Sequence, residues 1–480
     1  MVCKRKRLSE SGWKKDNQFK NFFDNISNVQ KEKLDRALTL FVVGCNLPFS
    51  TVDSRFFKTF IQELRPAYSV PCSKTLSGSL LNSVHEEIVK TDRANVGETS
   101  VMLIDGWKNS SNNTKQVVTI LHSVGGQCCF LDSYDITGNS ETGEELYNIC
   151  QNSITLAKER YDTDVYAIVS DNAANMLKMG RLSSNLMHST CNSHTGNLLA
   201  KDILDLATAS KVSLILREFK HPDLEKDIIS DGGSKIQLAV DTRWASYRDA
   251  FVCLIQNLGH MKTIAAKSNV KVKTNIVSLL YDESFIQNVE KAIDVSNNVC
   301  LLINECQSRE CSLADASEKW LKLELPDECQ EFLKNRKNMA LNIYALASNY
   351  LHPSYRGNLL TEGQIDQVEK YLLENLDKEG LSSLQQFNMN ADIFKILLEK
   401  EITCPVTYWG LASRKHDQLS KLAVKLLNIP ASSAQLERVF SSWSFIHSDL
   451  RNRLGSEKSK KLVHCYYSLH LSHTSTTNID

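Results

Sequence analysis

The sequence of 480 residues lacks an excess of charge of either sign and a long hydrophobic run. Lys plus Arg and Asp plus Glu both number 56, so no overall field would draw the chain to nucleic acid or to an anionic membrane. The longest apolar run, residues 37–45, is far shorter than the roughly 18 residues that a membrane span needs. We therefore expect no membrane partner, and any contact with DNA must come from a local patch.

The sequence also lacks paired cysteines and a secretory signal. None of its 14 cysteines forms a C-x-x-C pair, and no apolar segment follows the basic run Lys4–Arg7. Free thiols in a reducing compartment are therefore expected. The basic run is compatible with a nuclear import signal and equally with a solvated tail.

A further absence concerns hydrolases. There is no G-x-S-x-G, and the C-x-x-H formed by Cys191 and His194 has no evident oxyanion partner. This argues against a serine or cysteine hydrolase.

The length and the periodicity that are present indicate roughly three domains, or one large domain with an insertion. The hydrophobic share of 42% is enough for a sizeable core. The pattern predicts six segments: a polar basic tail (1–30), a helical lead-in (31–98), the first part of an α/β core (99–249), an all-helical insertion (250–420), the C-terminal part of the core (421–472) and a second tail (473–480).

From residue 99 the apolar period changes from helical to extended. The predicted strands are residues 99–105, 115–124, 127–136, 164–171 and 187–191. The turn at Gly125 and Gly126 joins the second and third strands, and Thr142 with Glu145 has the spacing of a capping box that starts a helix. Further helices follow the fourth and fifth strands. The order β-β-β-α-β-α-β-α is that of a ribonuclease H-like core, a mixed sheet with helices on both faces.

Two aspartates lie at neighbouring strand ends of such a sheet. Asp105 is on the first strand and Asp171 ends the fourth. Carboxylates on adjacent strands can hold Mg²⁺ or Mn²⁺, because hard divalent ions prefer oxygen ligands. Aspartate at a strand end is also a common turn former or helix N-cap, so both roles stay open.

Five motifs in order carry a resemblance to a known family. They are LIDGWKNSS (103–111), VSDNAANM (169–176), CNSHTGNLL (191–199), DTRWASYRDA (241–250) and PASSAQLERVFSSWSFI (430–446). This series resembles that of the hAT-superfamily transposases, including the region catalogued as a domain of unknown function, DUF659, around the first aspartate. The likeness covers roughly residues 35–470.

The resemblance implies that Asp105, Asp171 and Glu437 are the DDE triad of the family, which binds Mg²⁺ or Mn²⁺. From the residues alone, Glu437 lies on the flank of an apolar helical stripe and could point toward the sheet. It could equally be an ordinary first-turn acid after Pro430. Glu218 is the alternative third acid, because it follows the fifth strand without an insertion.

The resemblance implies further roles. Arg243 and Trp244 match the RW motif, whose tryptophan stacks on an extruded base in the family. Cys191 and His194 match the C-x-x-H motif, and we interpret them as packing and positioning residues. Two such ligands do not make a zinc site, so none is predicted.

The resemblance implies that the helical insertion contacts DNA, and that a dimerisation region within residues 421–472 forms a homodimer or higher homo-oligomer. The apolar C-terminal stripe comprises Leu450, Leu454, Leu462, Tyr466 and Leu469. It resembles the dimerisation element of the family, but such a stripe could equally pack within its own chain.

One departure from the family concerns the BED zinc finger that typically begins its members. Only Cys3 and Cys45 lie in the first 50 residues, with no histidine, so recognition of transposon ends by such a finger is in doubt. Two functions remain: a nuclear DDE-type enzyme that cleaves and transfers DNA strands, or a domesticated, catalytically silent nuclear protein that dimerises and associates with DNA.

Overall fold

The computed structural model describes residues 24–108, 113–240, 244–267, 272–446 and 455–474. At its centre is a mixed sheet of five strands, β1 (Thr99–Lys108), β2 (Lys115–Ser123), β3 (Cys128–Asp135), β4 (Asp164–Ser170) and β5 (Met187–Thr190). The spatial order is β3-β2-β1-β4-β5. The pairs β1–β2 and β2–β3 are antiparallel, whereas β1–β4 and β4–β5 are parallel. The predicted ribonuclease H-like α/β fold is thereby confirmed.

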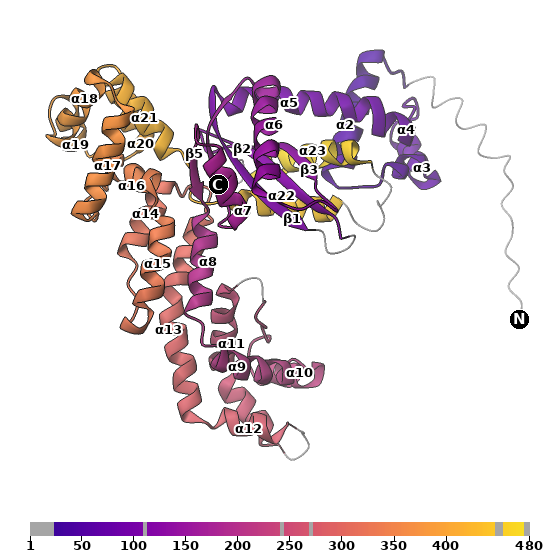
Figure 1. Cartoon of the computed structure of the whole chain (residues 1–480). Coiled ribbons are helices and arrows are strands. Elements are labelled where there is room, and N and C mark those ends of the chain that lie inside the picture. Colours follow the sequence, from indigo (N-terminus) through magenta and orange to yellow (C-terminus); the bar gives the residue numbers. More distant parts are fainter. Residues whose placement is uncertain (1–23, 109–112, 241–243, 268–271, 447–454, 475–480) are drawn as a thin grey trace, which may run out of the picture.

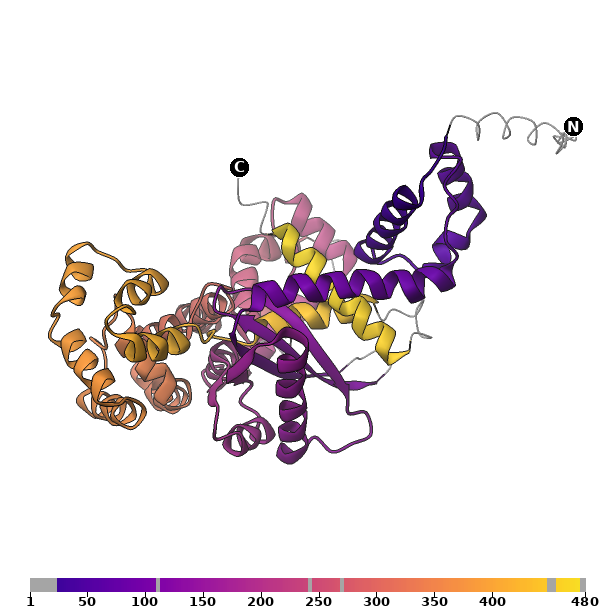
Figure 2. The same cartoon turned by 90° about the horizontal axis from the view of Figure 1, so that it is seen from above.

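The alternation of side chains along β1 explains why the sheet is covered on both faces. Met102 and Ile104 pack with residues of α6 (Gly143–Tyr161) and α7 (Ala174–Leu182). Val101 and Leu103 belong to the larger core on the opposite face, which includes residues of helices at both ends of the sequence. These helices are α5 (Leu81–Val96), α22 (Ala434–Ile446) and α23 (Ser456–Thr474). Figure 2 shows α22 and α23, in yellow, beside the sheet and the long α5.

The N-terminal helices form a small lobe with its own core. Its elements are α2 (Asn28–Gly44), η1 (Phe49–Asp53), α3 (Arg55–Leu64), α4 (Ser73–Thr75) and η2 (Leu76–Leu80), which continues into α5. Ser27 and Gln30 form a complete capping box at the start of α2. Val42, Val52 and Leu76 are buried together in this lobe.

Between the sheet and α22 the described residues are helical (Figure 1). One arm consists of α8 (Asn192–Asp202), α9 (Leu206–Phe219), α10 (Pro222–Ser230), α11 (Ala245–Ala265), α12 (Thr274–Leu280) and α13 (Glu283–Cys306). The second group consists of α14 (Leu313–Lys322), η3 (Asp327–Cys329), α15 (Gln330–Ala340), α16 (Ile343–Leu351), α17 (Glu362–Asn375), α18 (Lys378–Asn388), α19 (Ile393–Glu399), α20 (Pro405–Ala412) and α21 (Asp417–Leu427). The predicted segment boundaries at 250 and 420 fall inside α11 and α21.

The predicted capping box at α6 is half formed. The Thr142 hydroxyl accepts from the N–H of Glu145 at 3.2 Å, as expected. The reciprocal bond is missing, because the N–H of Thr142 donates to Ser140 and the Glu145 carboxylate accepts from Asn139. The prediction was therefore wrong for the second bond of the box.

The C-terminal apolar stripe packs within its own chain. Leu462 is buried, and Tyr466 and Leu469 pack partly buried against the larger core. The buried His464 on α23 hydrogen-bonds Asp92 of α5 at 2.7 Å and His85 at 3.1 Å. Leu450 and Leu454 lie outside the described residues. Among the helices that are described, none has the length and apolar character needed to cross a membrane.

Candidate active site

Asp105 lies near the C-terminal end of β1 and is half-buried. In the parallel pair of β1 and β4, Leu103 stands opposite Val169. The paired part of the two strands ends there, and Asp105 and Asp171 each lie two residues beyond it. The two acids that the sequence predicted to face each other therefore leave the same edge of the sheet.

Asp171 follows β4 directly and begins the turn into α7. One of its carboxylate oxygens accepts a hydrogen bond from the N–H of Ala173 at 3.0 Å. The turn-forming role that competed with metal binding is thus present. It engages one of the two oxygens of the carboxylate, so the two roles are compatible.

Glu437 is brought to this edge by the return segment, which we define as Pro430–Ser433. The N–H of Ser433 donates to the Cys191 thiol at 3.4 Å, and the Ser432 hydroxyl donates to the Cys306 carbonyl at 2.7 Å. The Asn192 N–H and side-chain amide both donate to the Ala431 carbonyl, at 2.9 and 3.0 Å. The return segment is therefore fixed from both sides before α22 begins.

Helix α22 then packs on the end of β1. The ring of Trp107 stacks on Phe440, with centroids 6.1 Å apart and planes inclined by 12°. Leu436, Val439 and Trp443 are buried, while Glu437 is exposed. The apolar stripe of the helix thus faces the core and leaves Glu437 on its flank.

The charges of these acids act on one another. Burial, followed by the negative charge of Asp171, raises the pKa of Asp105 to about 8. The charge of Glu437 adds to the shift, and a hydrogen bond from Gly106 opposes it. A carboxyl with this environment holds its proton near neutral pH unless a cation is bound beside it.

Glu141 belongs to the same group and escaped the sequence analysis. Its charge also raises the pKa of Asp105. A Cβ atom at position 106 would lie 3.1 Å from Glu141 Oε1, so Gly106 allows this carboxylate to approach the strand. Asn175 on α7 donates to the Glu141 carbonyl at 3.1 Å. We call Asp105, Glu141, Asp171 and Glu437 the acidic cluster. The glycine directly after Asp105 was the one feature of the sequence that could have indicated Glu141.

Comparison with protein families assigns two regions of the chain. Residues 71–219 match the domain of unknown function DUF659, and residues 384–468 match the hAT family C-terminal dimerisation region. Both matches are consistent with an hAT-family transposase-like protein. Comparison with curated proteins finds no match. The first match contains Asp105 and Asp171, and the second, a region named for dimerisation in the hAT family, contains Glu437.

The acidic cluster offers oxygen donors of the kind that Mg²⁺ and Mn²⁺ prefer. Within the described ranges, however, no group of three or more His, Cys, Asp or Glu side chains is close enough to hold a metal ion. The carboxylates influence one another electrostatically without forming a ready ligand set. An ion together with substrate phosphate oxygens would have to draw them together.

The other predicted site residues lie around this cluster and beyond it. Cys191 is buried and contacts the return segment, whereas His194 is exposed on the first turn of α8. Glu218, the alternative third acid, lies on α9 in the helical arm. Its carboxylate forms an ion pair with Lys273 at 2.7 Å.

The RW motif is only partly described. Arg243 lies outside the described residues, and Trp244 immediately precedes α11. Its indole ring is half-buried and stacks on Tyr247, with centroids 5.5 Å apart and planes inclined by 14°. The tryptophan is therefore neither a fully buried core residue nor a fully exposed one.

Proposed function

We propose that this protein cleaves and transfers DNA strands by DDE-type chemistry, with Asp105, Asp171 and Glu437 as the acids of the site. The observation that carries the proposal is the electrostatic coupling of Asp105 to both other acids at one edge of the sheet. Three carboxylates that repel one another favour binding of divalent cations.

In this proposal the acids bind the metal ions, and other residues position the acids or contact the DNA. Asp105 and Asp171 would hold Mg²⁺ or Mn²⁺ from strand ends that the sheet keeps in register. Glu437 would complete the set from α22, whose position the return segment determines. Bound ions supply Lewis acidity that activates water or a 3′ hydroxyl for attack on a phosphodiester. The chain positions the acids, and Arg243 and Trp244 would contact the DNA.

The test is nicking of supercoiled plasmid in Mn²⁺. Asp171→Asn and Glu437→Gln should each lower the rate of nicking by about 100-fold or more, because each removes one negative charge from the metal-binding carboxylates. Glu218→Gln is the matched control, since Glu218 pairs with Lys273 away from the cluster. Nicking that persists in Asp171→Asn would contradict the proposal.

A second candidate function is a catalytically silent nuclear protein that dimerises and associates with DNA. It is favoured by the lack of a ready ligand group in the described part of the chain. Under this alternative, wild type and Asp171→Asn both self-associate and neither nicks DNA. Sedimentation and the nicking assay, run on the same preparations, separate the two candidates.

We also propose that the protein acts in the nucleus and self-associates, as a dimer or larger homo-oligomer, through its C-terminal region. Fluorescence microscopy of a tagged chain, with and without substitution of Lys4–Arg7 by glutamine, tests the location. Sedimentation of the full chain at several concentrations tests the oligomer. A cytoplasmic wild type or a monomer at all concentrations would contradict the respective proposal.

A further inference from the structure

A cavity of about 910 Å³ lies toward the end of the sheet that is opposite to the acidic cluster. Its walls come from α2, α5, the turn between β2 and β3, the loop between α13 and α14, and the ends of α21 and α23. His122, which lines the cavity, stands opposite Val101 near the start of β1, whereas Asp105 lies four residues further along that strand. A cavity of this size can enclose a small organic molecule.

One wall of the cavity is apolar. Leu40 of α2, Ile88 of α5 and Leu469 of α23 line it, and all three are only partly buried against the larger core. These side chains therefore keep apolar surface that is accessible from the cavity. Covering such surface removes it from water and is favourable, so an apolar molecular body is expected to bind against this wall.

Polar groups converge at another part of the lining, around Cys128 at the start of β3. His122 Nδ1 lies 3.4 Å from Cys128 Sγ. Burial raises the pKa of the Cys128 thiol to about 12, and the positive charges of Arg309 and Arg438 oppose this rise. Arg309 lines the cavity together with Cys128 and His122. The two charges that act on the thiol are thus both positive, which favours an anion at this part of the cavity.

Two of these groups have unused hydrogen-bonding capacity. The half-buried guanidinium of Arg309 forms no ion pair within the described ranges. His122 is 7% exposed, and burial lowers its pKa to about 4, so its ring is neutral at neutral pH. Its Nε2 has no hydrogen-bond partner in the part of the chain that the structure describes. A neutral ring whose Nδ1 accepts the thiol proton of Cys128 carries its own hydrogen on Nε2, which can donate to an anion.

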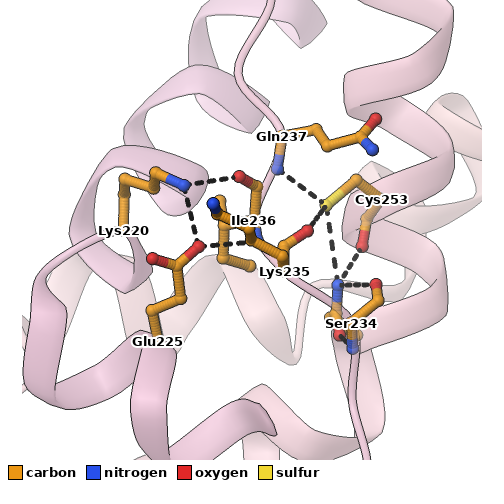
Figure 3. Close-up of polar contacts among 8 residues, drawn as sticks. Lys220, Glu225, Ser234, Lys235, Ile236, Gln237 and Cys253 are labelled. Carbon is orange, nitrogen blue, oxygen red and sulfur yellow. Dashed lines mark hydrogen bonds and ion pairs between the residues drawn. The ribbon is translucent and has the colours of Figure 1, made fainter. Parts of the chain in front are cut away.

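A polar cluster in the helical arm provides a contrast (Figure 3). Lys220 pairs with Glu225 at 2.8 Å and also donates to the Ile236 carbonyl at 2.8 Å. The Glu225 carboxylate accepts in addition from the Ile236 N–H at 3.0 Å. This half-buried cation therefore finds its counter-charge within the chain, as buried charges normally do. Arg309 has no such counter-charge among the described residues and is available to a ligand.

Three carboxylates also line the cavity, and two of them are engaged. Glu87 pairs with Arg36 at 2.6 Å, and Asp92 accepts from His464 at 2.7 Å. Glu310 is exposed and forms no ion pair in the described chain, so its negative charge would oppose an anion in the cavity. Removing the charge of Glu310 should therefore have the opposite effect to removing that of Arg309.

We propose that this cavity binds a small amphipathic organic anion. Its anionic group contacts Arg309 and the ring of His122, and its apolar body covers the wall formed by Leu40, Ile88 and Leu469. The site goes beyond the proposed DNA-processing function, since it needs neither the acidic cluster nor a metal ion.

The experiment compares two dyes by fluorescence titration of the full chain. One is the anion 8-anilinonaphthalene-1-sulfonate, and the other is the uncharged N-phenyl-1-naphthylamine. Arg309→Gln should weaken binding of the anion by about tenfold and leave the neutral dye unaffected, because a charge-assisted hydrogen bond is lost. Glu310→Gln should strengthen binding of the anion by about two- to threefold, because a repelling charge is removed.

Arg217→Gln is the matched control. Arg217 is exposed on α9 in the helical arm, so this variant removes the same charge away from the cavity and should bind the anion like the wild type. Ile88→Trp fills the cavity and should abolish specific binding of both dyes, with circular dichroism to show that the variant is folded. The comparison of Arg309→Gln with Arg217→Gln decides the matter even if Ile88→Trp does not fold.

Four results would overturn the proposal. They are an Arg309→Gln variant that binds the anion like the wild type, an Arg217→Gln variant that is equally impaired, a neutral dye that is weakened by Arg309→Gln as much as the anion, and a Glu310→Gln variant that binds the anion less tightly.

The outcomes also separate this inference from the proposed function. Asp171→Asn should bind the anionic dye like the wild type while losing nicking. A wild type that nicks DNA but does not bind the anion would overturn the cavity proposal and leave the DDE proposal standing. Binding of the anion without nicking would support the cavity proposal and contradict the DDE proposal.

Discussion

The return segment and the acidic cluster lie next to each other and follow opposite physical rules. The return segment is buried, and its polar groups are paired with Cys191, Asn192 and Cys306. The acidic cluster is half-exposed and brings like charges together. Burial with complete hydrogen bonding stabilises the fold, whereas uncompensated like charges destabilise it. The hydrogen bonds of the buried return segment therefore offset the repulsion among the carboxylates that this segment positions.

The largest effect on stability is expected from Asn192→Ala. Asn192 is 1% exposed, its Oδ1 accepts from Trp320 Nε1 at 2.9 Å, and its amide donates to Ala431. Removing it leaves the buried Trp320 N–H unpaired, while the Ala431 carbonyl keeps the bond from the backbone N–H of residue 192, so the free energy of unfolding should fall by about 1–3 kcal/mol in urea titration. Asn375→Ala is the control, because Asn375 is exposed and its amide bonds Tyr371 of its own helix. An equal loss of free energy of unfolding in both variants would contradict the stabilising role of the hydrogen bonds between Asn192 and the return segment.

Asp105→Asn should stabilise the protein by about 1–2 kcal/mol at pH 8, which is less than the roughly 5 kcal/mol of the full pKa shift because Asp105 is only half-buried and solvent screens its charge. The pKa of Asp105 is raised to about 8 in the folded protein, whereas the unfolded chain ionises near pH 4. The folded state therefore binds the additional proton between these values, and the stability of the wild type falls as the pH rises through this window. Thermal unfolding in metal-free buffer should show no gain at pH 4 and a gain that grows up to pH 8. A gain independent of pH would refute this assignment.

Gly106→Ala should cost about 0.5–1 kcal/mol, because its Cβ would crowd Glu141 Oε1 and displace a flexible side chain. Urea titration measures the cost. In Gly410→Ala the new methyl group meets no atom within 4 Å, so this control should be neutral or slightly stabilising. If both substitutions behave alike, Glu141 does not depend on the glycine.

The smallest effect is expected from Glu141→Gln. Removing this charge should lower the pKa of Asp105, because the charge of Glu141 raises it. The change should be small, because Glu141 is the weakest of the groups that raise this pKa. The pH dependence of stability should then move to lower pH by a few tenths of a unit. Glu145→Gln, whose carboxylate accepts from Asn139, should leave the profile unchanged. A shift in the control instead would assign the effect to general surface charge.

The sheet and two of its acids were predictable from sequence for a physical reason. Continuous apolar runs within residues 99–105 and 164–171 indicate strands that are buried on both faces, and neighbouring strands follow from the order of elements. The charge of Asp171 influences Asp105, and their role as a pair of metal ligands stays a prediction. Glu437 depended on the family resemblance, because its helix reaches the sheet only after the long helical stretch.

What the sequence did not reveal depends on contacts between distant residues. Asn192 and Ala431 are 239 residues apart, and no local pattern indicates their bond. Glu141 sits in a loop whose direction is determined by packing against Gly106 and Asn175. The second half of the capping box failed because Ser140 and Asn139 offered closer partners. Periodicity identifies elements, but competition among nearby polar groups is decided in three dimensions.

The packing of α22 and α23 on the sheet has a consequence for synthesis. These helices cover the face that carries Val101 and Leu103, and they are the last part of the described chain to leave the ribosome. During translation α5 is available to this face, but its other cover is not, so apolar strands remain open while the helical arm is made. Closure of the core must await synthesis of α22 and α23, and nascent chains that stop before α22 should be substrates for chaperones and proteases.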